Sequence, residues 1–156
     1  MKYLQLLGTC LIALFALSHV SASAQSSVPV NEPDLNKPKL FSNLPDKIPV
    51  DVNTLQGLIN SDNGKDISLR LGQDAMSNFD GKVISKTNDN NIQSVVIRSG
   101  NFNGATLSLS SSTKPDGAVK FTGRIISFRH GDMYELENQN NQYILIKKNF
   151  YDVINE

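Results

Sequence analysis

The side chains that most often carry enzyme chemistry are scarce in this sequence. It contains one cysteine, Cys10, and two histidines, His19 and His130. His130 is followed by Gly131 and Asp132, a composition typical of a turn. A zinc site needs three or four ligands, and a serine triad needs a histidine beside its nucleophile. No ligand set and no Gly-x-Ser-x-Gly elbow accompanies His130.

Carboxylates are the catalytic groups that could act without leaving a motif. A glycoside hydrolase uses two acids that can come from distant strands, and such a pair has no sequence signature. The candidates for an unmarked carboxylate site are Asp80, Asp132, Glu135 and Glu137. Because nothing singles out a pair, we expect a non-enzyme with no catalytic, cofactor-binding or metal-ligating residues. A hydrolase remains the second alternative.

Two polar clusters and a serine run resemble sites in composition only. Residues 62–66 and 88–91 are rich in Asp and Asn, but neither has the twelve-residue spacing with a terminal Glu that a calcium loop needs. Both are predicted to be turns. An exposed strand edge and turn are predicted for the serines Ser108, Ser110, Ser111 and Ser112.

The charge balance argues against a general nucleic-acid binder. Lysine plus arginine and aspartate plus glutamate each total 15, which gives a formal net charge of zero. Binding to phosphates needs a basic excess. The basic residues of the second half are interleaved with acids and predict a solvated surface; they are Lys114, Lys120, Arg124, Arg129, Lys147 and Lys148.

The N-terminus has the parts of a secretory signal peptide. Lys2 precedes a mostly apolar run over residues 4–17, and Ala22-Ser23-Ala24 offers a cleavage site of small residues. We place cleavage between Ala24 and Gln25, which predicts a secreted or periplasmic protein. The apolar run is shorter than the roughly 20 residues of a membrane-spanning helix, so we expect no transmembrane anchor after processing.

A lipoprotein signal is the disfavoured alternative. Leu7-Gly8-Thr9-Cys10 would make Cys10 the lipidated residue, but it leaves an apolar segment shorter than the usual h-region of about 7–15 residues. Cleavage after Ala24 would instead remove Cys10. The mature chain would then have no cysteine and would depend on core burial without disulfides.

Residues 25–49 have the composition of a proline-rich tether. Five of the prolines, Pro29, Pro33, Pro38, Pro45 and Pro49, lie here among polar residues. Proline lacks a backbone donor and restricts the residue before it, which favours a mobile linker. In the alternative, the arm docks on the domain through Leu35, Leu40, Phe41 and Leu44.

Residues 50–156 are predicted to form a single all-β domain with one short helix at its N-terminal end. The helix spans 51–60, with Asp51 as its N-cap and with Val52, Leu55 and Ile59 on one face. From Ile67 the hydrophobic period changes to two, which predicts strands at 67–71, 79–86, 92–99, 105–111, 119–128, 133–137 and 143–148. Phe150, Tyr151, Val153 and Ile154 would form a last short strand or a helical turn. The fold class is a mainly antiparallel meander of at least six strands, as a sandwich or an open barrel.

One strand pattern occurs twice in the predicted domain. Residues 79–85 and 121–127 both have Phe, any residue, Gly, a base, Val or Ile, Ile and Ser. We expect these two segments to be equivalent strands of one sheet. Ile126 and Phe128 break the alternation of the second copy, which predicts either a bulge after Gly123 or a partly covered second face.

Turn lengths predict the register of the second half. Two-residue turns at 130–131 and 139–140 would pair Ile125 with Leu136, Arg124 with Glu137 and Leu136 with Tyr143. A loop at Lys114-Pro115-Asp116-Gly117 would pair Ile125 with Leu107. These pairings predict that Leu107, Ile125, Leu136 and Tyr143 form one inward-facing row, because a slip of one residue would turn the row to solvent.

The order of these strands and turns resembles the β-rich prodomain of adamalysin-type (reprolysin) zinc metalloproteases. The resemblance covers about residues 65–148 and is carried by Ile67–Leu71, Phe79-Asp80-Gly81-Lys82-Val83, Leu107-Ser108-Leu109, Gly123-Arg124-Ile125 with Gly131, and Tyr134-Glu135-Leu136. No His-Glu-x-x-His motif is present, and no mature cysteine could ligate a catalytic zinc. The resemblance therefore implies a prodomain-like module without a catalytic domain.

These observations predict a secreted, non-catalytic protein-binding module without a cofactor. The resemblance implies a stand-alone regulator of peptidases, with a secreted metallopeptidase as its partner. Nucleic acid is not an expected partner. The first alternative is a structural or surface-assembly component of the cell envelope, which would use open strand edges to meet other chains.

Overall fold

The computed structural model describes residues 37–149. The predicted signal peptide, Cys10, His19, Leu35 and the C-terminal residues 150–156 lie outside the described residues. No helix among those described is long and apolar enough to cross a membrane.

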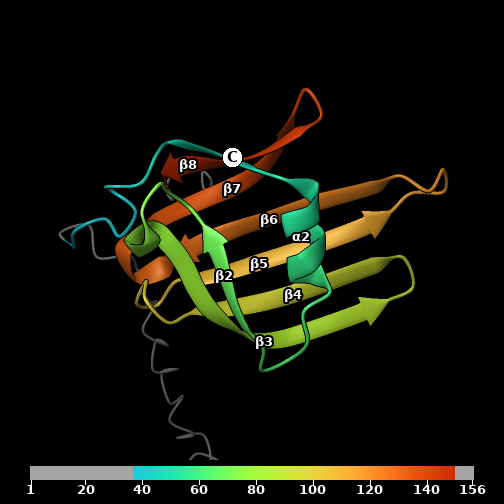
Figure 1. The fold of residues 1–156 in the computed structure, drawn as a ribbon, viewed down its shortest axis with the longest axis horizontal. Coiled ribbons are helices and arrows are strands. Elements are labelled where there is room, and N and C mark those ends of the chain that lie inside the picture. The colour runs from blue at the N-terminus through green and yellow to red at the C-terminus, as the bar shows by residue number, and fades with distance from the viewer. Residues whose placement is uncertain (1–36, 150–156) are drawn as a thin grey trace, which may run out of the picture. The chain divides into compact units, whose positions relative to one another are not determined.

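The described residues form one antiparallel sheet of eight strands in the order β1-β8-β7-β6-β5-β4-β3-β2 (Figure 1). The strands are β1 (Lys47–Val50), β2 (Asp66–Arg70), β3 (Asn78–Asp89), β4 (Ile92–Ser99), β5 (Thr106–Thr113), β6 (Val119–Ser127), β7 (Asp132–Gln139) and β8 (Gln142–Asn149). From β2 to β8 each strand pairs with the next in sequence. The prediction of an antiparallel all-β meander with at least six strands is confirmed. The strands belong to one curled sheet that is open along one side.

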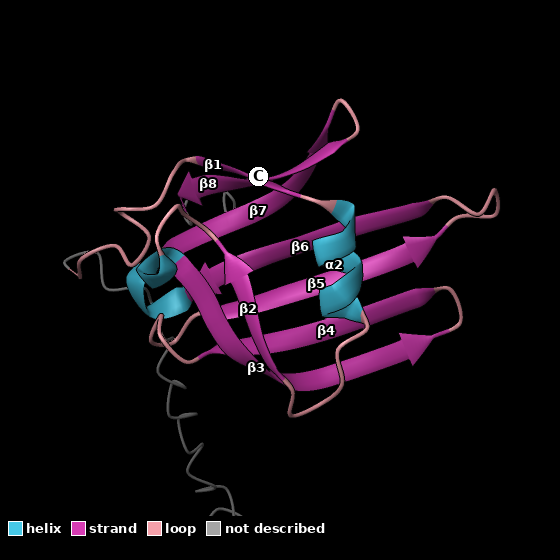
Figure 2. Cartoon of the chain, viewed as in Figure 1, coloured by secondary structure: helices cyan, strands magenta, loops and turns pink. Residues whose placement is uncertain are grey.

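The single α-helix of the described region, α2 (Val52–Ile59), lies across one face of the sheet and packs on β4 and β5 (Figure 2). The Asp51 carboxylate accepts a hydrogen bond from the Thr54 N–H at 2.8 Å, which confirms the predicted N-cap. Leu55, Leu58 and Ile59 are buried against the sheet. Val52, predicted on the buried face, is half exposed, because the apolar face is rotated toward Leu58.

The hydrophobic core lies between α2 and the sheet. Alternate residues of successive strands face it, as the period of two requires. Val83 and Val95 come from β3 and β4, and Leu109 comes from β5. Burial of such side chains contributes about 1.5–3 kcal/mol each.

The two copies of the repeated pattern occupy equivalent positions in β3 and β6. Phe79 and Phe121 are buried in the core, and the glycines two residues later, Gly81 and Gly123, face the same side. A Cβ atom at Gly123 would lie 2.7 Å from the Ser108 carbonyl oxygen. Both copies therefore need glycine because the neighbouring strand approaches too closely for a side chain.

The two copies differ in how they continue. β3 carries a register shift between Val83 and Ser85, whereas β6 pairs with both neighbours without one. The bulge predicted as one explanation for Ile126 is therefore absent from β6. Instead Ile126 pairs with Met133, and the two form a small buried cluster separate from the main core. The second explanation, a partly covered second face, is correct.

The predicted register is right for one hairpin and shifted by two residues in the others. Leu107 pairs with Ile125, as predicted. Ile125 pairs with Tyr134 instead of Leu136, because residues 128–131 form the connection: a 3-10 turn closed by Gly131 at φ 59°. Leu136 pairs with Leu145 instead of Tyr143, because the next turn is Asn140-Asn141, both at positive φ.

The arm from residue 37 to residue 46 is docked at one end of the sheet. Phe41 is buried in the core, with its ring centroid 5.4 Å from that of Tyr134. The Phe41 N–H donates to the Asp132 carboxylate at 2.9 Å, and the Tyr134 hydroxyl donates to the Pro45 carbonyl oxygen at 2.5 Å. The docking alternative therefore describes residues 37–49, and the folded domain begins before residue 50.

Candidate functional site

The open side of the sheet forms a groove between its two edge strands. β1 and β2 are joined through α2 in the chain, yet they stand at opposite ends of the strand order. Pro45, residues 47–51 and residues 68–73, with Thr54 of α2, line a cavity of about 540 Å³. This volume lies within the range of about 300–1,000 Å³ that is usual for ligand sites.

The β2 edge presents a row of available backbone groups, of which those of Ser68 and Arg70 border this groove. The Leu71 N–H donates to the Ser77 carbonyl, and the Val83 N–H donates to the Lys65 carbonyl. Since hydrogen-bonded positions alternate in an antiparallel pair, odd-numbered residues of β2 face β3. The N–H and C=O groups of Asp66, Ser68 and Arg70 therefore point away from β3. Within residues 37–149, β2 has no second partner strand.

The β1 edge is protected by its sequence. The Lys147 N–H donates to the Asp46 carbonyl, so Asp46, Ile48 and Val50 face β8 and the alternate residues face the groove. Those alternate residues are Lys47 and Pro49. Proline has no N–H to offer, and lysine and proline are common on protected edges. The two walls of the groove thus differ: β2 can pair with another strand, and β1 offers little.

The charged side chains of the groove lining are two cations, Arg70 and Lys47, and one anion, Asp51. Arg70 on β2 is exposed and forms no ion pair with a residue of the described chain. Lys47 adds a second cation on the β1 wall. The one acid of the lining, Asp51, stays ionised, because hydrogen bonds from the Thr54 hydroxyl and N–H lower the pKa of its carboxyl.

A shallower depression of about 780 Å³ lies over β2, β3 and the end of β4. Its lining combines Asp66 and Asp80 with Lys82 and Arg98. Asp66 and Lys82 already form an ion pair at 3.4 Å. Its lining includes residues 66–68 of β2, but the other lining residues lie on β3 and at the end of β4, which are paired with neighbouring strands.

His130 lies in the 3-10 turn after β6, which confirms the turn interpretation. Its Nδ1 atom is 3.0 Å from the Pro38 carbonyl oxygen, so the ring helps to hold the arm. Lys39 acts in the same place, donating to the Gly131 carbonyl at 2.7 Å.

The structure separates Asp80 and Asp132 from each other and from the pair Glu135 and Glu137. Asp132 is buried and caps the Phe41 N–H, whereas Glu135 and Glu137 lie on the opposite face of the same strand. Asp80 is four strands away in the sheet, about 19 Å along it at 4.8 Å per strand. Glycosidase carboxylates lie about 5–10 Å apart.

Glu135 and Glu137 converge on one cation. The Lys148 ammonium lies 3.0 Å from a carboxylate oxygen of Glu135 and 2.7 Å from one of Glu137. Hydrogen bonds from Lys148 and then Gln139 lower the pKa of Glu137. The predicted pairing of Arg124 with Glu137 is wrong, because the two-residue shift places Arg124 opposite Glu135. A general acid would need a raised pKa, which this arrangement opposes.

The serine run lies in the middle of the sheet, not at an exposed edge as predicted. β5 is flanked by β4 and β6, and Ser111 is buried. The Ser110 hydroxyl lies 2.7 Å from that of Ser94 in the neighbouring strand.

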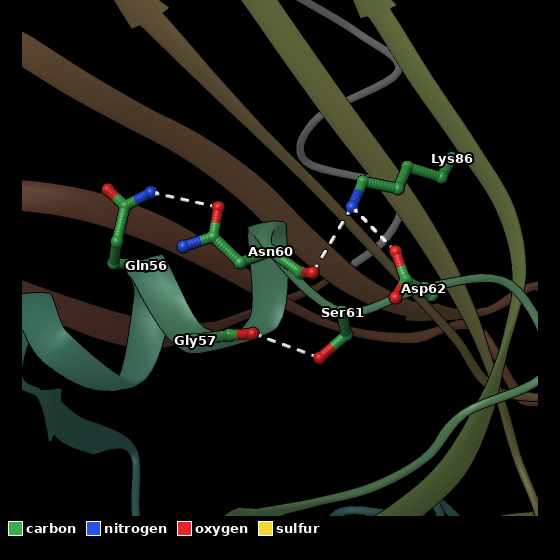
Figure 3. Close-up of polar contacts among 6 residues, drawn as sticks. All are labelled: Gln56, Gly57, Asn60, Ser61, Asp62 and Lys86. Atoms are coloured by element: carbon green, nitrogen blue, oxygen red, sulfur yellow. Dashed lines mark hydrogen bonds and ion pairs between the residues drawn. The ribbon is translucent and has the colours of Figure 1, made fainter.

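Residues 62–66, the first of the two Asp- and Asn-rich clusters, contain a turn whose Asp62 carboxylate is paired with a lysine ammonium. Lys86 of β3 donates to the Asn60 carbonyl at 3.1 Å and to the Asp62 carboxylate at 3.2 Å, at the C-terminal end of α2 (Figure 3). Residues 88–91 likewise form the β3–β4 hairpin. Among the described residues, no three His, Cys, Asp or Glu side chains are grouped so that they could hold a metal ion.

Comparison with known proteins gives no match: no family model, no curated protein and no solved structure is similar to this chain. The resemblance to metalloprotease prodomains stays a prediction. The groove was not predicted from the sequence either, because β1 was placed in the tether. The available signal was the alternation of Ile48 and Val50 with Pro49, which is typical of an edge strand.

Proposed function

We propose that this protein is a secreted, non-catalytic binding module that takes an extended segment of a partner protein into the groove between β1 and β2. The segment adds to the sheet as a strand against β2. One observation carries the proposal: the backbone groups of Ser68 and Arg70 face a cavity instead of a partner strand, and those of Asp66 continue the same unpaired edge.

The energetics suit reversible binding. Three N–H and three C=O groups can accept an added strand, and each hydrogen bond contributes about 0.5–1.5 kcal/mol net. The total, about 3–9 kcal/mol, is opposed by about 1–2 kcal/mol for each ordered residue of the segment. Backbone pairing alone therefore gives weak binding, and side chains on both strands must supply the remainder.

The partner class we propose is a secreted metallopeptidase, on the ground of the prodomain resemblance. The module would cover the cleft of the peptidase by capturing an extended segment at its rim. A thiol–zinc contact has no part in this mechanism, since cleavage after Ala24 would leave no cysteine. The same free edge also suits a surface-assembly component, which is the second candidate.

Ser68→Pro tests the proposal, because Ser68 points its N–H into the groove and a proline there removes a donor without breaking the β2–β3 ladder. Ser68→Ala is the matched control. We expect a captured partner to be lost with Ser68→Pro and retained with Ser68→Ala, at equal thermal stability.

The captured protein is identified by mass spectrometry and added back in a peptidase assay. Equal capture by both variants would refute strand addition at β2. Capture of an envelope protein without peptidase activity, dependent on Ser68 in the same way, would establish the assembly role instead.

A further inference from the structure

We infer that the segment bound in the groove runs antiparallel to β2 and has the order acid, apolar, any residue, apolar, base. The acid lies opposite Arg70 and the base opposite Asp66. This inference rests on the proposed function and specifies the chemistry of its ligand.

The direction of the bound segment follows from the unequal numbers of backbone groups that β1 and β2 offer. All strand pairs of the sheet are antiparallel, and antiparallel pairing is the more stable kind per residue. β1 offers only the backbone groups of Lys47 and the Pro49 carbonyl, so β2 dictates the direction. The residues opposite Asp66, Ser68 and Arg70 then form the hydrogen-bonded pairs, and their side chains share a face with those three.

The outward positions of the bound segment are those whose side chains lie on the same face as Asp66, Ser68 and Arg70. The charges of Asp66 and Arg70 determine which side chains bind there. Arg70 stands beside Asn78 of β3, which cannot neutralise it, and Lys47 is another cation on the groove wall. An acid opposite Arg70 is therefore the strongest requirement. Asp66 already has Lys82 at 3.4 Å, but both side chains are largely exposed, so a base opposite Asp66 contributes less.

The inward positions of the bound segment, opposite Ile67 and Leu69, favour apolar side chains. They face the side to which Leu69 and Leu71 of β2 and Ile48 of β1 contribute, and all three are buried. A charged side chain placed there would lose its hydration without gaining a partner. Two apolar residues therefore separate the acid from the base, with one permissive position between them.

Two blocked pentapeptides test this order on the full mature chain. Glu-Val-Thr-Val-Lys has the inferred order, and Lys-Val-Thr-Val-Glu has the same composition with the charges exchanged. Binding is followed by NMR through the amide signals of Asp66, Ser68 and Arg70. We expect about tenfold weaker binding of the exchanged peptide, because two cross-strand pairs change from attractive to repulsive.

The double variant with Asp66→Arg and Arg70→Asp should reverse the preference. Arg98→Asp, a charge reversal outside the groove lining, should leave the preference unchanged. If neither peptide shifts the three amides, strand addition itself fails and the proposed function falls with it. If both peptides bind equally, the function stands and the inferred order is refuted.

A second copy of the chain is the competing occupant that the test must detect. β2 itself, Asp66-Ile67-Ser68-Leu69-Arg70, has the inferred order, so two β2 strands would be complementary about Ser68. We commit to a partner segment, because β1 and Thr54 of α2 border the groove in each copy of this chain, and a free extended segment carries no such walls. Concentration-dependent dimerisation with shifts of the same amides in the absence of peptide would overturn that choice.

Discussion

Alanine at the two repeated glycines should destabilise the fold, and alanine at a third glycine should stabilise it. At Gly123 a Cβ atom would lie 2.7 Å from the Ser108 carbonyl oxygen and 3.1 Å from a methyl carbon of Leu109. At Gly81 it would lie 2.5 Å from the Arg98 carbonyl oxygen and 2.9 Å from Ile97 Cγ2. At Gly57 of α2, no atom lies within 4 Å.

The magnitudes follow from these distances. Ordinary contact begins near 3.4 Å, and the clashing oxygens belong to backbone that is held in the ladder. Overpacking of this kind costs about 1–3 kcal/mol, and alanine recovers about 0.4–1 kcal/mol by restricting the unfolded chain. We expect a net loss of about 1 kcal/mol for Gly123→Ala and about 2 kcal/mol for Gly81→Ala. Gly57→Ala should gain about 0.5–1 kcal/mol, because glycine is unfavourable inside a helix.

Urea unfolding followed by circular dichroism measures the effect. A shift in the midpoint at constant slope reports a change in stability. The urea midpoint should therefore rise in the order Gly81→Ala, Gly123→Ala, wild type, Gly57→Ala. A Gly81→Ala protein as stable as the wild type would refute the argument that close strand approach requires glycine in the repeated pattern.

Three further predictions concern polar groups. Ser127→Ala should raise stability by about 1 kcal/mol in urea unfolding, because the buried Ser127 hydroxyl has no hydrogen-bond partner among the described residues; a loss of stability would show that it has one. Lys86→Ala should lower stability by about 0.5–1 kcal/mol, more at low salt, by removing the ammonium from the C-terminal end of α2, whereas the exposed ion-pair partner Lys82→Ala should have almost no effect. Burial, then the charges of Asp46 and Asp132, raise the pKa of Tyr134 above its usual value, so stability should be complete below about pH 10 and fall above it as the unfolded state ionises first; Tyr134→Phe should flatten this alkaline decline, and an unchanged decline would contradict the assignment.

The sequence predicts the strands and their faces better than their exact pairing. Leu136 and Tyr143 are both buried, although neither has its predicted cross-strand partner. The reason is that the two hairpin errors are slips of two residues. A side chain returns to the same face after two positions, so hydrophobic alternation fixes the face, and only the turn geometry fixes the partner. Asparagine tolerates positive φ, and the turn therefore forms at Asn140 and Asn141 and not at residues 139–140.

The structure of residues 37–50 was harder to predict, because proline occurs both in mobile linkers and in edge strands. In the sequence, Pro45 and Pro49 indicate a mobile tether, but Pro49 occupies an edge-strand position at which no N–H is needed for the ladder with β8. A proline at such a position costs no hydrogen bond, so the strand forms around it. Local composition cannot distinguish these cases, because the deciding contacts come from β8, almost 100 residues later in the chain.

The groove could not be predicted from residue types, because its most informative groups belong to the backbone. An open strand edge is usually a liability, since it can pair with the edge of any other chain. Here β1 carries Lys47 and Pro49, while β2 keeps three residues available but faces a groove bordered by β1 and the start of α2. The structure thus combines protection of one edge with access to the other, which is the combination that selective capture of a single segment requires.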